Sequence, residues 1–320
     1  MKKTLIVATR DGALAVTQTG LVVSAIRKIY PDIDIRIKKI TSQGDKDRRT
    51  TLWELKSTGF FTTALEDALL AGQADPPKGE VSPKADIAVH SFKDLPTAIR
   101  EGLVIGAVLK REFPEDCLVS AASPLRGLRR EGGAARIKSL DELPKGAKVG
   151  TSSLRRTVQL KRLRGDLECL PIRGNVNTRL RKLEKGDFDA IVLARAGLER
   201  LGLSDKISIV FDPTRFIPSP AQGALAVEIR ADDTETKQIV SKLDDKNTRI
   251  ETEAERLVFS SLECGCHAPA GAFAQVRNSE ITVSAFYCEP DGKNYANDTL
   301  SGPANDYETI ARALAEKISH

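Results

Sequence analysis

Hydroxyl side chains and arginines stand together in one short segment of this sequence: Thr151, Ser152, Ser153, Arg155 and Arg156. Hydroxyl residues at the start of a helix cap it, and the backbone N–H groups of its first turn bind anions. The helix dipole disfavours cations in that turn, so the two arginines predict an anionic ligand between them. A solvated arginine pair beside a serine cap is the structural alternative.

A second segment, with Arg173, Gly174, Asn175 and Arg179, has the same design. Glycine lets a ligand approach the backbone closely, and guanidinium groups bind carboxylates through two parallel hydrogen bonds. Arginines spread over several loops suit a ligand that carries several carboxylates. A nucleotide site is not indicated, because the sequence has neither a Walker-type phosphate loop nor a dinucleotide-binding glycine motif.

A third polar group, Ser91, Lys93 and Asp94, follows an apolar stretch at residues 85–89. Adjacent Lys–Asp pairs are mostly surface pairs that contribute little. In a cleft lined by arginines, however, the Asp94 carboxylate would stay ionised and could stabilise a cationic intermediate or relay a proton. Arg10 follows the first apolar stretch of the chain and is predicted to lie at the same cleft.

Cys264, Cys266 and His267 form the last chemically interesting cluster. No second cluster of suitable spacing completes a four-ligand metal site, so no metal is predicted. A buried structural thiol is one alternative. The turn is bounded by Gly265 and Pro269 and would leave a thiol accessible, which favours covalent attachment of a group.

The elements that must position these residues alternate between strand and helix. Strands are predicted over 4–9, 33–41, 85–89, 148–150, 167–172 and 188–193. Helices are predicted over 14–29, 60–70, 153–163, 177–185 and 196–201. Ligands of open parallel sheets bind beyond the carboxyl ends of the strands, which is where the polar groups stand.

This alternation predicts two α/β domains whose parallel sheets carry helices on both faces. A break near 110–145, rich in glycine, proline and arginine, separates the two blocks, and a proline-rich loop spans 75–83. After residue 245 a helix (250–262), two strands (272–277 and 280–287) and a final helix (306–319) predict a small α+β domain.

Composition excludes several classes of protein. No apolar run approaches membrane length, and the five cysteines do not resemble a secreted disulfide framework. The net charge of +5 is mild, and only 5% of residues are aromatic, so a nucleic-acid groove with stacking rings is not indicated. We expect a soluble cytoplasmic protein without membrane or nucleic-acid partners.

The sequence resembles the porphobilinogen deaminase family over essentially its whole length. Six motifs in the family's order carry the resemblance: Thr-Arg-x-x-x-Leu-Ala (9–15), Ala-Asp-Ile-Ala-Val-His-Ser-Phe-Lys-Asp-Leu-Pro (85–96), Gly-Thr-Ser-Ser-Leu-Arg-Arg (150–156), Arg-Gly-Asn-Val-x-Thr-Arg-Leu-Arg-Lys-Leu (173–183), Gln-Gly-Ala-Leu (222–225) and Cys-Gly-Cys (264–266).

The resemblance implies an α/β fold with two doubly wound domains like those of periplasmic binding proteins, and a small α+β C-terminal domain. The implied boundaries are 1–111 with 223–243, 112–222, and 244–320. Family members join four porphobilinogen molecules into hydroxymethylbilane, a step of tetrapyrrole biosynthesis, on a covalently attached dipyrromethane cofactor. They act as monomers and need no metal.

Positions that match the family's motifs imply roles for individual residues. Asp94 corresponds to the catalytic aspartate and Cys266 to the cysteine that attaches the cofactor through a thioether. The implied cofactor-binding residues are Ser91, Lys93, Thr151, Ser152, Ser153, Arg155, Arg156, Arg173, Gly174 and Asn175. The implied substrate-binding residues are Arg10, Phe61, Arg179, Arg200 and Gln222.

Three positions depart from the family's usual pattern. Gly12 stands where serine is common, Ala221 replaces a glycine, and Cys264 adds a second thiol beside Cys266. The alternative to an enzyme is a binding protein for a carboxylated small molecule, built on the same two-lobed scaffold. The third domain, Asp94 and Cys266 favour the enzyme.

Overall fold

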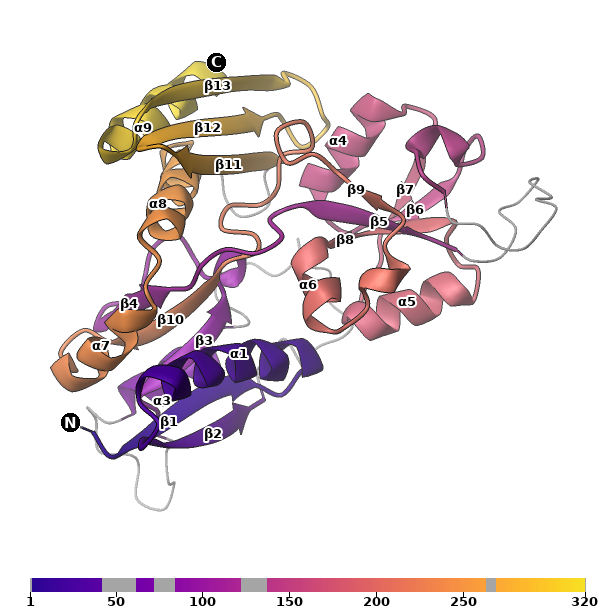
Figure 1. Ribbon diagram of the computed structural model, residues 1–320. Coiled ribbons are helices and arrows are strands. Elements are labelled where there is room, and N and C mark those ends of the chain that lie inside the picture. The colour runs from indigo at the N-terminus through magenta and orange to yellow at the C-terminus, as the bar shows by residue number, and fades with distance from the viewer. Residues whose placement is uncertain (1, 42–61, 72–83, 122–136, 263–268, 320) are drawn as a thin grey trace. The chain divides into compact units, whose positions relative to one another are not determined.

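The computed structural model describes residues 2–41, 62–71, 84–121, 137–262 and 269–319 (Figure 1). The chain divides into two compact units. Unit 1 comprises Met1–Glu112 and Gly223–Glu253, and unit 2 comprises Phe113–Gln222 and Ala254–His320. The predicted three-domain boundaries stay a prediction.

Unit 1 contains a five-stranded sheet of order β2-β1-β3-β10-β4. Its strands are β1 (Thr4–Arg10), β2 (Asp34–Ile40), β3 (Ile87–Ser91), β4 (Leu103–Val108) and β10 (Leu225–Arg230). Strand β1 pairs in parallel with β2 and β3, whereas β10 runs antiparallel to β3 and β4. The expected parallel sheet therefore contains an antiparallel strand from a distant part of the chain.

Both faces of this sheet are covered, as predicted. The helical elements of unit 1 are α1 (Ala13–Ile29), α3 (Thr63–Leu70), η1 (Phe92–Asp94), α7 (Thr234–Val240) and η4 (Ser241–Leu243). Leu5 and Val7 pack with the buried face of α1, and Ala8 packs on the other side with α3. The alternation of β1 therefore divides its residues between two apolar layers.

Unit 2 contains a second five-stranded sheet, of order β7-β6-β8-β5-β9. Its strands are β5 (Asp116–Ser120), β6 (Lys148–Gly150), β7 (Glu168–Leu170), β8 (Ala190–Ala194) and β9 (Ile209–Val210). Its helical elements are η2 (Leu140–Glu142), α4 (Leu154–Leu163), α5 (Val176–Glu184), α6 (Arg195–Arg200) and η3 (Ser204–Lys206). Strand β6 is parallel to β7 and β8, and β5 is antiparallel to β8 and β9.

The C-terminal part of the chain forms an antiparallel sheet of order β11-β12-β13. Its elements are β11 (Ala270–Arg277), β12 (Glu280–Tyr287), β13 (Ala296–Pro303), η5 (Ala304–Asp306) and α9 (Tyr307–Ile318), preceded by α8 (Lys246–Ser261). Helix α9 packs on β12 and β13 through Ala311, Leu314, Ala315 and Ile318 (Figure 1).

The predicted fold class is confirmed: two mixed α/β sheets and a small antiparallel sheet with helices. Strand β5 lies inside the region that sequence reasoning treated as a break, and β10 was missed. Both are short strands that pair with strands far away in the sequence. In the described residues no helix is long and apolar enough to cross a membrane.

Asp233 connects the start of α7 to Lys2, which precedes β1, and to Arg230, the last residue of β10. Its carboxylate caps α7 through the Thr236 N–H and accepts hydrogen bonds from Lys2 and Arg230. Burial raises the pKa of Asp233, but the bonds to Thr236, Lys2 and Arg230 outweigh burial and hold the pKa well below its ordinary value. The ionised carboxylate therefore stabilises the folded state.

We expect Asp233→Asn to lower the free energy of unfolding by about 1.5–3 kcal/mol at neutral pH. Because the folded-state pKa is depressed, this difference from wild type should shrink as the pH falls below about 4, the pKa of an unfolded aspartate. Urea unfolding between pH 7 and pH 3 measures it. Asp298→Asn, which removes an exposed pair with Lys317, is the control and should cost about 0–1 kcal/mol. A difference that stays constant to pH 3 would contradict the assignment.

Candidate functional site

Three predicted residues of unit 1, Arg10, Ser91 and Asp94, lie at the carboxyl edge of its sheet. Arg10 is the last residue of β1, Ser91 is the last residue of β3, and Asp94 ends η1. Because β1 and β3 are parallel, their carboxyl ends share one edge. A cavity of about 30 Å³ lies there, lined by Arg10, Ala15, Gln18, Thr62, Leu65, Val89, His90, Ser91 and Asp94.

The turn that carries Asp94 is anchored by its apolar residues. Phe92 and Leu95 are 3% and 5% exposed, and the Phe92 N–H donates to the carbonyl of Ala224 at 3.1 Å. Between these anchors Lys93 is half-buried and Asp94 is exposed. The fold therefore presents the Asp94 carboxylate to solvent on a fixed turn.

Gln18, His90 and Glu228, none of which was predicted to be a binding or catalytic residue, support this edge. The Gln18 amide lies in hydrogen-bond contact with the Ser91 hydroxyl, its nitrogen 2.9 Å and its oxygen 3.1 Å from Oγ. His90 Nε2 lies 3.1 Å from Glu228 Oε2, and both side chains are almost fully buried. Gln18 is a polar residue on the buried, mainly apolar face of α1, and this was its only signal in the sequence.

In unit 2, the predicted hydroxyl residues hold the start of α4. Ser153 is the N-cap residue, and its Oγ accepts from the Arg156 N–H. The Ser152 hydroxyl donates to the Ile172 carbonyl at 2.7 Å and accepts from the Ile172 N–H at 3.0 Å. Thr151 Oγ1 accepts from the Ser153 N–H. The capping role is confirmed, and Ser152 fixes the start of α4 to the segment after β7.

The carboxylate between Arg155 and Arg156 belongs to the chain itself. Arg155 Nη1 donates to Asp116 Oδ2 at 2.7 Å, and Arg156 Nη2 donates to Asp116 Oδ1 at 2.7 Å. Burial raises the pKa of Asp116, but the two arginine charges outweigh burial and hold the pKa well below its ordinary value. The anion that binds both arginines in the structure is therefore the Asp116 side chain, which the sequence analysis did not identify.

Helix α5 begins at a second cation-rich turn. Asn175 is the N-cap residue, and its Oδ1 accepts from the Thr178 N–H at 2.9 Å. Arg179 Nε donates to the Gly174 carbonyl at 2.7 Å. Burial, together with the positive charges of Arg156 and Arg173, lowers the pKa of Arg179 to about 10. A bound anion would relieve this repulsion, so the turn fits a polycarboxylate ligand.

Gly174 is required by its backbone and by its surroundings. Its φ is +109°, and a Cβ at this position would lie 2.5 Å from Thr178 Cγ2. Gly186 has a similar φ of +82°, but a Cβ there would meet nothing within 4 Å. Substitution of Gly186 therefore tests backbone strain alone, whereas substitution of Gly174 tests backbone strain together with a side-chain clash.

We expect Gly186→Ala to destabilise the fold by about 1–2 kcal/mol, because of its left-handed backbone alone. Gly174→Ala should cost at least about 1–3 kcal/mol more because of the contact with Thr178. The clash should also displace the backbone carbonyl of residue 174, which accepts a hydrogen bond from Arg179, and so weaken binding of an anionic ligand. Urea unfolding and ligand titration measure both effects. Equal costs for the two variants would contradict this explanation.

The remaining predicted residues are placed as follows. Arg200, the last residue of α6, is half-buried, and Gln222 is 1% exposed. Gln222 Nε2 donates to Asp116 Oδ1 at 3.0 Å and to the Pro114 carbonyl at 2.8 Å. Phe61 and Cys266, with Cys264, lie outside the described residues. The cleft predicted between the two domains stays a prediction.

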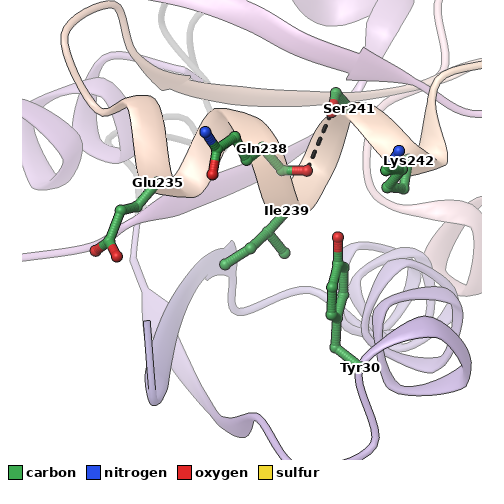
Figure 2. Close-up of a pocket in the computed structure, with 6 residues that line it drawn as sticks. All are labelled: Tyr30, Glu235, Gln238, Ile239, Ser241 and Lys242. Carbon is green, nitrogen blue, oxygen red and sulfur yellow. Dashed lines mark hydrogen bonds between the residues drawn. The ribbon is translucent and has the colours of Figure 1, made fainter. Parts of the chain in front are cut away.

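A larger hollow in unit 1, with a volume of about 500 Å³, contains none of the predicted residues. Figure 2 shows Tyr30, at the end of α1, facing Ile239 and Lys242 of the segment that contains α7 and η4. Within the described residues, no group of three His, Cys, Asp or Glu side chains is arranged to hold a metal ion.

Comparisons with solved structures give distant likenesses only. The sulphonate-binding protein SsuA of Escherichia coli has a TM-score of 0.41 at 17% identity and covers 82% of this chain and 72% of its own. A probable amino-acid transporter binding protein, YtmK of Bacillus subtilis, has a TM-score of 0.42 at 14% identity and covers 76% of this chain and 90% of its own.

Sequence comparisons are far stronger. Residues 5–238 match the model "Porphobilinogen deaminase, dipyromethane cofactor binding domain", and residues 249–320 match "Porphobilinogen deaminase, C-terminal domain". Porphobilinogen deaminases from Pelotomaculum thermopropionicum and Desulforudis audaxviator are 42% and 40% identical to this chain over 318 residues. These alignments cover 99% of this chain and 94% and 95% of the two relatives. The chain therefore belongs to the porphobilinogen deaminase family.

Proposed function

We propose that this chain carries out the porphobilinogen deaminase reaction with Asp94 as its catalytic carboxylate and Cys266 as the attachment point of its dipyrromethane cofactor. The enzyme is a transferase of tetrapyrrole biosynthesis, and its product is hydroxymethylbilane. The observation that carries the assignment of Asp94 is its position: an exposed carboxylate that lines one cavity with Arg10 and Ser91.

The charge pattern of unit 2 fits the dipyrromethane group, since each of its pyrrole rings carries two carboxylates. Arg155, Arg156, Arg173 and Arg179 stand on two neighbouring turns, and the positive charges of Arg156 and Arg173 already lower the pKa of Arg179. Charge-assisted hydrogen bonds contribute about 1.5–3 kcal/mol each. When bound, the cofactor supplies the pyrrole carbon to which the first porphobilinogen is joined.

Asp94 would act on the substrate through its negative charge. Loss of the amino group of porphobilinogen as ammonia leaves positive charge on the pyrrole, delocalised onto its nitrogen. An ionised carboxylate beside that nitrogen stabilises this charge and accepts a hydrogen bond from the N–H. Formation of the new carbon–carbon bond would release a proton from the nucleophilic pyrrole carbon, and we propose that the Asp94 carboxylate helps to accept this proton.

We propose that the other site residues bind and orient the cofactor and the substrate. We propose that the cofactor carboxylates and rings are held by Ser91, Lys93, Thr151, Ser152, Ser153, Arg155, Arg156, Arg173, Gly174 and Asn175. We propose that incoming porphobilinogen is bound by Arg10, Phe61, Arg179, Arg200 and Gln222. The motif positions support these roles. So does the gathering of polar groups at the carboxyl ends of parallel strands in each of the two sheets.

We also propose that the enzyme works as a monomer in the cytoplasm. Of the five cysteines, Cys117 and Cys288 are buried and form no disulfide, which supports a reducing compartment. Gel filtration with light scattering tests the monomer.

The proposed function is tested by the intact mass of the purified, denatured chain. We expect a surplus equal to two porphobilinogen molecules less two molecules of ammonia, and we expect porphobilinogen to be converted into hydroxymethylbilane. A chain of unmodified mass that does not change after incubation with porphobilinogen would refute the covalent mechanism and favour a binding protein.

A further inference from the structure

We propose that Asp116 is a positioning residue that orients Arg155 and Arg156 toward the carboxylates of the dipyrromethane group. This inference rests on the proposed function, because it assigns Asp116 a task in binding that cofactor. Asp116 belongs to none of the six motifs and was not identified as a site residue from the sequence.

Three side chains converge on the Asp116 carboxylate, which is 0% exposed. Oδ2 accepts from Arg155 Nη1 at 2.7 Å. Oδ1 accepts from Arg156 Nε at 3.1 Å and Nη2 at 2.7 Å, and from Gln222 Nε2 at 3.0 Å. The two contacts from Arg156 fix the plane of its guanidinium group, because Nε and Nη2 share one edge of the fork.

Backbone carbonyls complete the orientation of both arginines. Arg155 Nη1 also donates to the Ile217 carbonyl at 2.8 Å, and Arg156 Nη1 donates to the Val192 carbonyl at 3.1 Å. The Gln159 side-chain amide fixes the backbone of Ile217: its oxygen accepts from the Ile217 N–H at 2.6 Å, and its nitrogen donates to the Ile217 carbonyl at 3.0 Å. Asp116 is thus the shared acceptor of a network that leaves each guanidinium little freedom to rotate.

Strand topology explains why this carboxylate lies at the site. Strand β5 runs antiparallel to β8, and its first residue, Asp116, pairs with Ala194 at the carboxyl end of β8. The beginning of β5 therefore lies at the same edge as the carboxyl ends of β6 and β8, where α4 starts. An aspartate further along β5 would lie nearer the opposite edge of the sheet.

The charges explain why the site needs this carboxylate. Arg155 and Arg156 are only 6% and 7% exposed. Water therefore screens their mutual repulsion weakly. Asp116 carries one negative charge against two positive ones. It therefore stabilises the buried pair without neutralising it, and the excess positive charge remains for an anionic ligand.

The backbone next to Gln222 is fixed by a buried carboxylate, that of Glu255. Glu255 is fully buried, and its carboxylate accepts from the Ala221 N–H at 2.6 Å and the Ala274 N–H at 2.7 Å. Ala221 has a φ of +58°, so this bond fixes a left-handed turn immediately before Gln222. We infer that Gln222, besides the contact with porphobilinogen proposed above, also supports the site through its hydrogen bond to Asp116.

The test compares Asp116→Asn with Asp189→Asn, a matched control in the same unit. Asp189 Oδ2 accepts from the Lys148 N–H at 2.8 Å, so its loss lowers stability without altering the arginine contacts described above. Both variants should melt below wild type. Only Asp116→Asn should acquire the covalent cofactor more slowly than wild type, by about 10–100-fold.

The outcomes separate the two proposals. If wild type lacks the covalent surplus mass, the proposed function fails and this inference fails with it. If wild type is loaded and folded Asp116→Asn loads and binds as wild type does, Asp116 is structural only and the inference alone is overturned. Asp116→Glu, which keeps the charge but shifts it by one methylene, should recover part of the loading rate.

A measurement on wild type covers the case in which Asp116→Asn does not fold. The Arg156 Nε–H donates to a buried carboxylate, so its ¹⁵N-edited NMR signal should exchange with water much more slowly than that of Arg36. Arg36 bonds to Asp34 on the surface, with its side chain 72% exposed. Comparable exchange rates for Arg156 and Arg36 would show that the guanidinium is not held and would overturn the inference.

Discussion

Asp94→Ala is expected to leave the fold intact and to reduce the turnover of porphobilinogen by about 10²–10⁴-fold. The stability of the η1 turn comes from Phe92 and Leu95, which are buried, whereas Asp94 is exposed. Removal of its carboxylate therefore costs little folding energy. The same change removes the negative charge that would stabilise the positively charged pyrrole, so it raises the barrier of every condensation step.

Initial rates of ammonia release and the melting temperature measure this prediction together. Asp34→Ala, which removes another exposed carboxylate of unit 1, is the control and should retain wild-type turnover. Asp94→Glu should recover part of the rate, because the charge is kept and only its position changes. Turnover close to wild type in Asp94→Ala would remove Asp94 from the catalytic role.

Cys266→Ser is expected to produce a folded chain that lacks the covalent surplus mass and is inactive. The serine hydroxyl stays protonated near neutral pH and is a far weaker nucleophile than a thiolate, so a thioether cannot form and an ether forms too slowly. The assignment follows from the Cys-Gly-Cys motif and the register with Pro269 and Gly271, since Cys264 and Cys266 lie outside the described residues.

Intact mass after incubation with porphobilinogen measures this outcome, and the matched control is Cys264→Ser. The control should carry the full surplus, mapped to a peptide that contains Cys266. If Cys266→Ser is loaded and Cys264→Ser is not, the attachment point is Cys264. Loading of both variants would require a different nucleophile.

Most of the repeating elements could be predicted from local pattern. Residues 4–9 and 188–193 each contain a short apolar stretch, and Val149 and Gly150 stand directly before a polar turn. The structure has β1, β8 and β6 there. Amphipathic spacing likewise placed α1, α4 and α5 to within one or two residues. Strands β4, β5, β9, β10 and β13 were missed. The first four pair with strands that are distant in the sequence, and β13 is a largely polar segment.

The candidate site likewise contains residues that the sequence predicted and residues that only the structure revealed. Sequence alone determined which groups stand at the ends of parallel strands, because successive strands of a βαβ repeat point their carboxyl ends to one edge. Arg10, Ser91, Asp94 and Thr151 were found by this rule.

Only the tertiary structure decided which groups support them. Asp116 and Glu228 stand on the antiparallel strands β5 and β10. These strands are inserted between strands from other parts of the chain, so their register depends on partners far away in the sequence, such as Ala194 for Asp116 and Ser91 for Leu225. Local residue patterns carry no information about such pairings, and for this reason a buried aspartate between two arginines could be recognised only in the folded chain.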